Sequence, residues 1–263
     1  LATPTLEAPG PAPPMSPGGE TVIPLTPIRR AIADHMVRSR QTSPHAWMMM
    51  EVDMSPVVQL RGAWREEFKR RHGVGLTFLP FVARAVVEGL RRFPTLNSTW
   101  SEQGVVLKHD INLGIAIALE DNLIVPVIRN ADRLTVTGLA TAMGDLADRA
   151  RTKRLKPDET QGGTFTLNNT GSLGTVMSQP IINQPQAAIL AMDSIIKRPV
   201  VVAGASVRSG SGPVGGSDAI AVRAMMNLCI SFDHRINDGL SATRFLKAVK
   251  ETLETLDPAA SLA

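Results

Sequence analysis

The stretch DAIAVRAMMNLCISFDHRINDGL, residues 218–240, holds the pattern that decides the fold. Apolar residues occupy alternate positions along it: Val222, Ala224, Met226, Leu228, Ile230 and Phe232. This period of two is typical of a strand with one face in a core. Asp238 and Gly239 favour a tight turn, and a helical stripe follows at Leu246, Val249, Leu253 and Leu256. We therefore predict a long strand, a turn and a final helix.

His234 lies at the junction between that strand and that turn. A strand end holds an imidazole rigidly, and histidine has the unperturbed pKa closest to neutral pH, so this position suits a general base. A lone histidine is more often a surface or structural residue. The rest of the sequence has to decide between these two interpretations.

Helices and strands are predicted along the rest of the chain without strict β-α-β alternation. Helices are expected at 26–40, 57–73, 77–94 and 137–151. Strands are expected at 46–55, 110–119, 122–130, 163–169 and 187–202, the last with an irregular middle. Residues 203–217 are predicted to form a flexible hairpin connection. This mixture predicts a layered α/β domain with a mixed sheet.

The first predicted helix begins at Thr26, a favourable N-cap residue, with Pro27 at its first position. One helical face gathers apolar residues: Ile28, Ile32, Met36 and Val37. The other side carries arginines: Arg29, Arg30, Arg38 and Arg40. We expect an amphipathic helix whose basic side faces outward.

Residues 1–19, LATPTLEAPGPAPPMSPGG, contain six Pro, three Gly, three Ala and no basic residue. Such a composition cannot bury a core and favours an extended linker. We expect a linker cut from a longer protein, with the folded domain at 20–263. The alternative is a terminal tail without a role.

Composition narrows the classes of function. The chain has 263 residues, 43% of them hydrophobic, which is enough for one domain of this size or two smaller ones. Cys229 is the single cysteine, so no disulfide framework is expected. The five histidines show no metal-ligand spacing, and no apolar run is long enough to cross a bilayer. The net charge of +4 favours anionic ligands. Nucleic acid is therefore an alternative partner, but a weak one, because the sequence contains no nucleic-acid-binding motif.

A resemblance supplies the context of His234. SFDHRINDG, residues 231–239, is similar to the His-x-x-x-Asp-Gly motif of the dihydrolipoamide acyltransferases, the core subunits of 2-oxo acid dehydrogenase complexes, and of chloramphenicol acetyltransferase. Further stretches resemble that family in the same order: PIRRAIADHMVRSRQTSPH, LTFLPFVARAVVEGLRRFPTLNS, INLGIAIALEDNLIVPVIRNAD, LKPDETQGGTFTLNNTGSLGTVMSQPIINQPQAAILAM and IIKRPVVV. The resemblance implies a two-layer α/β sandwich with a mixed sheet and makes residues 20–263 an acyltransferase catalytic domain. Residues 1–19 then resemble the family's Ala/Pro linker to lipoyl and peripheral-subunit-binding domains.

The resemblance implies acyl transfer between a dihydrolipoyl thiol and coenzyme A. His234 would take the proton from the attacking thiol, and the thiolate would add to the thioester carbonyl. Asp238 would orient and balance charge at the turn without acting as a base, although an Asp-Gly pair also simply turns a chain. In the family, the site lies between subunits of a trimer, with the histidine from one subunit and the oxyanion donor from the next.

The oxyanion donor is expected in GGTFTLNNTGSLG, residues 162–174. This chain departs from the family there, because Asn168 stands where the family has a serine, or Asn169 does if the register differs by one. An asparagine amide can donate a hydrogen bond to an oxyanion. The alternative is that Asn168 caps the turn before Gly171.

Coenzyme A also needs cations for its phosphates. KRRHG, residues 69–73, ends a predicted helix, and Arg70, with Arg71 behind it, is the candidate for the 3′-phosphate. A solvated helix end, where cations suit the helix dipole, explains the same residues.

The acyl group is predicted to be branched-chain, with acetyl second. A catalytically silent scaffold core is the alternative of another class; Asn168 suggests it, and the intact His234 and Asp238 oppose it. A Ser-His-Asp hydrolase is disfavoured because no Gly-x-Ser-x-Gly motif occurs.

The expected partners are further copies of the chain, as trimers in a larger core. Decarboxylase and dihydrolipoamide dehydrogenase subunits are expected to join through upstream domains that also carry the lipoyl group. The expected location is the cytoplasm of a bacterium, or the mitochondrial matrix if the source is eukaryotic.

Overall fold

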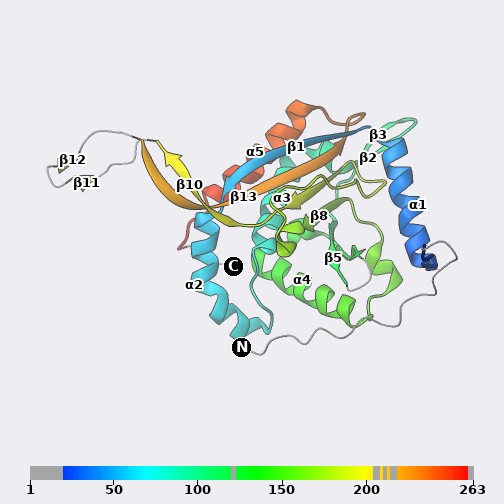
Figure 1. The fold of residues 1–263 in the computed structure, drawn as a ribbon, viewed down its shortest axis with the longest axis horizontal. Helices are drawn as coiled ribbons and strands as arrows, with labels where there is room; N and C mark the ends of the chain where they lie inside the picture. The colour runs from blue at the N-terminus through cyan, green and yellow to red at the C-terminus, as the bar shows by residue number, and fades with distance from the viewer. Residues whose placement is uncertain (1–19, 120–122, 204–207, 210–211, 214–217, 260–263) are drawn as a thin grey trace.

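The computed structural model describes residues 20–119, 123–203, 208–209, 212–213 and 218–259 (Figure 1). The predicted linker, residues 1–19, lies outside the described residues, as does most of the predicted connection at 203–217. The α-helices of the described part are α1 (Pro27–Thr42), α2 (Ser55–His72), α3 (Leu79–Arg92), α4 (Val136–Arg151) and α5 (Gly239–Glu254). Each of them corresponds to a helix predicted from the sequence.

A mixed sheet of seven strands forms the centre of the molecule. Its strands lie in the order β1-β13-β9-β8-β4-β7, and β10 continues along the same edge of β13 as β9. The strands are β1 (His45–Asp53), β4 (Leu113–Ile115), β7 (Val127–Ile128), β8 (Phe165–Asn169), β9 (Ala188–Met192), β10 (Ile196–Val202) and β13 (Ala219–Asp233). β13 runs antiparallel to its neighbours, whereas β8 runs parallel to β9 and β4. The predicted α/β fold with a mixed sheet is confirmed.

The core lies between this sheet and the layer formed by α2, α3, α4 and α5. Leu228, Ile230 and Phe232 of β13 are fully buried there, together with Phe245 and Val249 of α5. The alternation along β13 therefore points every second side chain at the helices. These two layers give the site a rigid base.

The connection at 174–187 crosses the opposite face of the sheet. The Trp47 indole Nε1–H donates to the Ser178 carbonyl at 2.9 Å, and the Asn227 amide donates to the Val176 carbonyl at 2.7 Å. Ile182 of this connection is fully buried. Polar side chains on the second face of β1 and β13 thus tie down a segment without regular structure.

A β-bulge separates β9 from β10. Met192 pairs with Leu228 and Ile196 pairs with Met225, so three residues on one strand face two on β13. Such a bulge bends a strand and re-aims its side chains. The irregular middle predicted for residues 187–202 is this bulge.

Two apolar surfaces are more exposed than the sequence suggested. Thr26 caps α1 as predicted, its Oγ1 accepting from the Arg29 N–H at 3.1 Å, yet Ile28 and Val37 on the supposed inner face are exposed. Figure 1 shows β10 and the first half of β13 projecting as a ribbon, on which Val222 is exposed as well. The prediction that these residues face a core within the chain is wrong, because helix and ribbon extend beyond the body of the domain.

Three short hairpins complete the described part. β5 (Ile117–Ala118) pairs with β6 (Leu123–Ile124), and β4 pairs with β7, so the strands predicted at 110–119 and 122–130 lie side by side. β11 (Arg208–Ser209) pairs with β12 (Gly212–Pro213). The hairpin of β2 (Ser98–Ser101) and β3 (Gly104–Leu107) was not predicted.

Candidate active site

His234 directly follows β13, and its backbone N–H donates to the Pro44 carbonyl at 3.0 Å. Its side chain is exposed, with the ring centroid 5.9 Å from that of buried Phe232. Within the described residues, the imidazole makes no hydrogen bond. A fixed backbone with an accessible ring nitrogen is the geometry that a general base needs.

Asp233, the last residue of β13, is only 1% exposed and accepts several hydrogen bonds. Arg235 donates to it through Nε, 3.0 Å from Oδ1, and through Nη2, 2.6 Å from Oδ2. Ser43 Oγ donates to Oδ2 at 2.9 Å, and Gln184 in turn donates to Ser43. These bonds tie the turn that carries His234 to the chain between α1 and β1.

Burial alone would raise the pKa of the Asp233 carboxyl, but hydrogen bonds from Arg235 and Ser43 outweigh it and hold the pKa below its ordinary value. The hydrogen bond to Asp233 raises the pKa of Arg235 in return. Both groups are therefore charged at neutral pH. The charges on either side of His234 compensate each other and hold the turn.

A third contact fixes the same turn from η1 (Pro94–Leu96). Asn237 is buried; Thr95 Oγ1 donates to its Oδ1 at 2.7 Å, and its Nδ2 donates to the Thr95 carbonyl at 3.2 Å. The guanidinium of Arg235 lies 5.0 Å from the centroid of the Trp100 ring, a cation–π distance. No local sequence pattern indicates these contacts, because 142 positions separate Thr95 from Asn237.

Asp238 is the N-cap residue of α5. Its Oδ1 accepts a hydrogen bond from the Ser241 backbone N–H at 2.7 Å. Hydrogen bonding from Ser241 lowers the pKa of Asp238, and the nearby His234 acts in the same direction. The structure thus brings Asp238 near His234 and gives it a local capping role, with no hydrogen bond between the two side chains in the described residues.

Asn168 and Asn169 end β8 and have different environments. The Asn169 Oδ1 accepts from the Ser172 N–H at 3.3 Å and caps η4 (Thr170–Leu173), the turn that contains Gly171. The capping role considered for Asn168 therefore belongs to Asn169. The Asn168 side chain is partly exposed and has no hydrogen-bond partner among the described residues, so its amide is free to donate.

Asn168 and His234 lie at opposite ends of the sheet. Asn168, Ala191 and Cys229 form one row across β8, β9 and β13, and the chain runs on along β13 from Cys229 to His234. At about 3.3 Å per residue along a strand and about 4.8 Å between strands, the two residues are roughly 19 Å apart. One chain alone cannot place both side chains on one reacting group.

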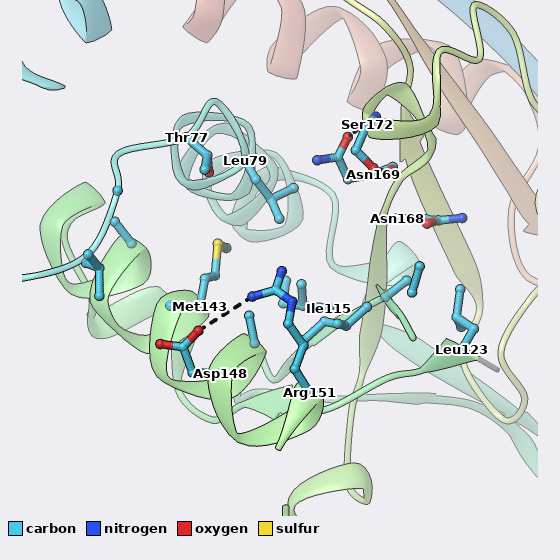
Figure 2. A pocket seen from close by; sticks show the side chains of 18 of the residues that line it. Thr77, Leu79, Ile115, Leu123, Met143, Asp148, Arg151, Asn168, Asn169 and Ser172 are labelled. Atoms are coloured by element: carbon cyan, nitrogen blue, oxygen red, sulfur yellow. Dashed lines mark hydrogen bonds and ion pairs between the residues drawn. The ribbon is translucent and has the colours of Figure 1, made fainter. Parts of the chain in front are cut away.

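A pocket of about 560 Å³ opens beside the end of β8 (Figure 2). Its walls come from the connection between α2 and α3, the strands β4 to β6, helix α4 and residues 168–173. Figure 2 shows Met143, Asp148 and Arg151 of α4 on one side of β8, with the Asn168 amide directed to the other side. The volume suits a small ligand or part of a larger one.

The predicted phosphate contacts lie next to this pocket and do not line it. Arg70 and Arg71 are exposed in the last turn of α2, where Arg71 pairs with Glu67, and the helix ends at Gly73 in a left-handed conformation. Arg151, which the sequence did not single out, lines the pocket itself and lies 3.5 Å from Asp148. In the sequence, Arg151 is marked only as a basic residue in the last turn of a predicted helix, which does not by itself indicate a ligand contact.

Among the described residues, no group of three or more His, Cys, Asp or Glu side chains is placed to hold a metal ion. In the same part of the chain, no helix has the length and apolar character needed to cross a membrane.

The chain matches the model of the 2-oxoacid dehydrogenases acyltransferase (catalytic domain) family over residues 17–262. The lipoamide acyltransferase component of the branched-chain alpha-keto acid dehydrogenase complex of Bacillus subtilis is 47% identical over 249 residues, which cover 95% of this chain and 56% of the relative. The dihydrolipoyllysine-residue acetyltransferase component of the pyruvate dehydrogenase complex of Mycobacterium tuberculosis is 41% identical over 229 residues, covering 86% of this chain and 40% of the relative. The chain spans about half the length of these curated relatives.

Solved structures agree with this match. A probable dihydrolipoamide acetyltransferase from Listeria monocytogenes has a TM-score of 0.86 at 46% identity and covers 93% of this chain and 99% of its own. The dihydrolipoamide acetyltransferase of Azotobacter vinelandii, investigated for the roles of a serine, a histidine and an asparagine in its mechanism, has a TM-score of 0.81 at 30% identity over 94% of this chain and 97% of its own. The likeness extends over the fold as a whole. The chain therefore belongs to the family of 2-oxoacid dehydrogenase acyltransferase catalytic domains.

Proposed function

We propose that this domain transfers an acyl group between the thiol of a dihydrolipoyl group and the thiol of coenzyme A. The observation that carries the proposal is His234, an exposed imidazole on a turn whose backbone Asp233, Arg235 and Asn237 hold in place. Thiols are largely protonated at neutral pH, and only the thiolate attacks a thioester. A positioned base is therefore what this transfer needs.

In the direction that forms acyl-coenzyme A, His234 accepts the proton of the coenzyme A thiol, and the sulfur forms a bond to the carbonyl carbon of the S-acyl dihydrolipoyl group. The carbonyl oxygen takes up the negative charge, and the Asn168 amide of a second copy donates a hydrogen bond to it. The bond from that carbon to the dihydrolipoyl sulfur then breaks. The leaving sulfur takes the proton back from His234, so charge and protons balance.

A shared site requires copies of the chain to meet head to tail. Exposed apolar side chains beside both elements support this: Trp100 and Leu240 near His234, and Leu173, Val176 and Met177 near Asn168. Two different patches at opposite ends form a heterologous contact, which builds a ring when the rotation from one copy to the next closes. We propose rings of three within a larger core; a related solved structure is the cubic core of a pyruvate dehydrogenase multienzyme complex, with a TM-score of 0.80 at 30% identity.

Co-expression of two impaired variants tests the shared site. His234→Ala and Asn168→Ala chains carry different tags, and assemblies that contain both are isolated. In a mixed ring, intact His234 of one chain meets intact Asn168 of its neighbour, so activity should rise above that of either variant assembled alone. Mixed assemblies with no more activity than the two variants show separately would refute the proposal.

The acyl group is proposed to be branched-chain, with acetyl as the second candidate. The branched-chain relative of Bacillus subtilis is 47% identical to this chain, whereas the acetyltransferase relative is 41% identical and a succinyltransferase relative from Bacillus subtilis is 38% identical. The test is an assay of acetyl-, isobutyryl-, isovaleryl- and succinyl-coenzyme A with dihydrolipoamide. Branched-chain donors should give the highest kcat/KM. A preference for acetyl would support the second candidate, and an assembled protein that transfers none of the four would be a silent scaffold core.

Coenzyme A is proposed to approach along the pocket beside β8. Its phosphates then contact either Arg70 and Arg71, at the rim of the pocket, or Arg151, in the pocket wall. The lipoyl group, the decarboxylase and dihydrolipoamide dehydrogenase partners, and the cytoplasmic location stay predictions that the family resemblance supports.

A further inference from the structure

Asp193 is a buried carboxylate outside the set of residues considered so far. It is the first residue of the bulge between β9 and β10, is 1% exposed, and donates its backbone N–H to the Asn227 carbonyl at 3.0 Å. No Lys, Arg or His forms an ion pair with it within the described residues. A buried carboxylate without a counter-charge is costly, so its remaining contacts need an explanation.

Two neutral donors hold this carboxylate, one from the first residue of η4 and one from β13. Thr170 Oγ1 lies 2.6 Å from Oδ1, the short distance of a charge-assisted hydrogen bond, and Cys229 Sγ lies 3.2 Å from Oδ2. Burial, reinforced by Asp193, raises the pKa of the Cys229 thiol to about 12, so the thiol stays protonated and can donate. Asp193 therefore links β13 to the first residue after β8.

The backbone makes the same link. A Cβ at Gly171 would lie 2.3 Å from the Asp193 carbonyl carbon, so the two chain segments touch without room for a side chain. Ser194 Oγ also donates to the Gly171 carbonyl at 3.0 Å. The bulge and the turn η4 are thus held together by side chains and by direct backbone contact.

The link to Asp193 restrains the end of β8, which has a partner strand on one side only. β8 pairs with β4 only as far as Leu167, so Asn168 and Asn169 pair with β9 alone, opposite Ala191 and Met192. Successive residues of a strand point to opposite faces, and a slip of one residue would turn the Asn168 amide to the helix side. An anchor at Thr170, immediately after the strand, fixes this register.

We propose that Asp193 is a positioning residue: through Thr170 and the contact with Gly171, it holds the end of β8 so that the Asn168 amide points at the developing oxyanion. Asp193 itself touches no reactant. The inference rests on the proposed role of Asn168 and extends it to a group on another strand.

The matched pair Thr170→Val and Thr170→Ser tests the link in the assembled protein, because valine keeps the shape of threonine and loses the hydroxyl, whereas serine keeps the hydroxyl. Thr170→Val should lower kcat about tenfold, less than the loss of a complete oxyanion donor, with KM for coenzyme A changed less than about twofold. Thr170→Ser should recover most of this turnover. Asp193→Asn should behave like Thr170→Val, since its amide cannot accept from both donors.

A double-mutant cycle separates positioning from general stability. If Asp193 and Thr170 act through Asn168, Thr170→Val should cause no further loss of kcat in the Asn168→Ala background. Independent, multiplying losses would overturn the inference, as would a Thr170→Val protein with a lower melting temperature and unchanged kcat. An Asn168→Ala protein with normal turnover would instead refute the proposed oxyanion donor, so the two failures are distinguishable.

Discussion

Arg235 holds the carboxylate of Asp233 through both Nε and Nη2, 3.0 Å and 2.6 Å from its two oxygens, and His234 is the residue between them. The carboxylate is 1% exposed, whereas the histidine is exposed. One ion pair thus turns the chain sharply at the strand end and leaves the imidazole outside. The stability of the turn and the reactivity of the histidine can therefore be tested separately.

Arg235→Ala should lower the free energy of unfolding by about 2 kcal/mol, because it leaves a buried carboxylate without its main donor. Urea denaturation at neutral pH and one protein concentration measures this change. The matched control is Arg198→Ala, which removes an exposed pair with Glu51 at 2.6 Å and should cost less than about 1 kcal/mol. Equal losses in the two variants would contradict the importance of the Asp233 contact.

Asp233→Asn should change how stability depends on pH. The pKa of Asp233 is lower in the folded chain than in the unfolded chain, so its stabilising effect is present above about pH 4, the ordinary value, and is lost as pH falls through the folded pKa. The variant should be less stable than the wild type at neutral pH, and the difference should shrink below about pH 4. Denaturation midpoints of both proteins across this range test it; a constant difference speaks against an ionised Asp233.

His234→Ala should lower turnover by about a hundredfold or more while the assembly stays intact. A general base contributes at least this much to many reactions, and the His234 side chain makes no hydrogen bond in the described structure. Its backbone bond to Pro44 is unaffected by the change. Acyl-transfer kinetics, mass in solution and melting temperature are the three measurements, and near-normal transfer by the folded variant would rule out the mechanism.

Asn168→Ala and Asn169→Ala should have opposite profiles. The first removes the free amide and should reduce kcat by about a hundredfold to a thousandfold, with little change in coenzyme A affinity or melting temperature. The second removes the cap that accepts from Ser172 and should lower the melting temperature by a few degrees, with a smaller loss of kcat. Asn168→Ser should keep most of the activity, because a hydroxyl donates from nearly the same place. The reverse pattern would assign the donor to Asn169.

Charge reversal distinguishes the candidate phosphate contacts. Arg151→Glu should raise KM for coenzyme A about tenfold or more if the pocket wall contacts a phosphate. Arg70→Glu should raise it by a similar factor if the last turn of α2, at the rim of the pocket, makes that contact instead. Each variant is measured at low and high salt, because screening should reduce the difference for a true phosphate contact. If neither variant changes KM, the phosphates bind away from this pocket.

Most of the elements follow from local patterns. The alternation from Val222 to Phe232 predicts the central strand, and Thr26 with Pro27 predicts the start of α1, because both depend on neighbours a few residues away. The unpredicted hairpin of β2 and β3 is short and lacks an Asn-Gly or Asp-Gly turn signal, so no local pattern marked it. The apolar face of α1 is exposed, contrary to the prediction, since amphipathicity identifies an apolar stripe without saying what covers it.

The residues of the site also fall into two groups: those that local sequence patterns predict and those that they do not. His234, Asp238 and Asn168 could be found in the sequence because their motifs are contiguous, whereas Ser43, Thr95 and Asp193 could not, since each acts across a large separation in the chain. Sequence by itself determined the fold class, the family and the candidate base. Only the tertiary structure decided that Asn169 is the cap and Asn168 the free amide, and that His234 and Asn168 lie at opposite ends of one sheet. The physical reason is that hydrogen-bond partners and strand register are set by the pairing of distant segments, which local residue patterns do not encode.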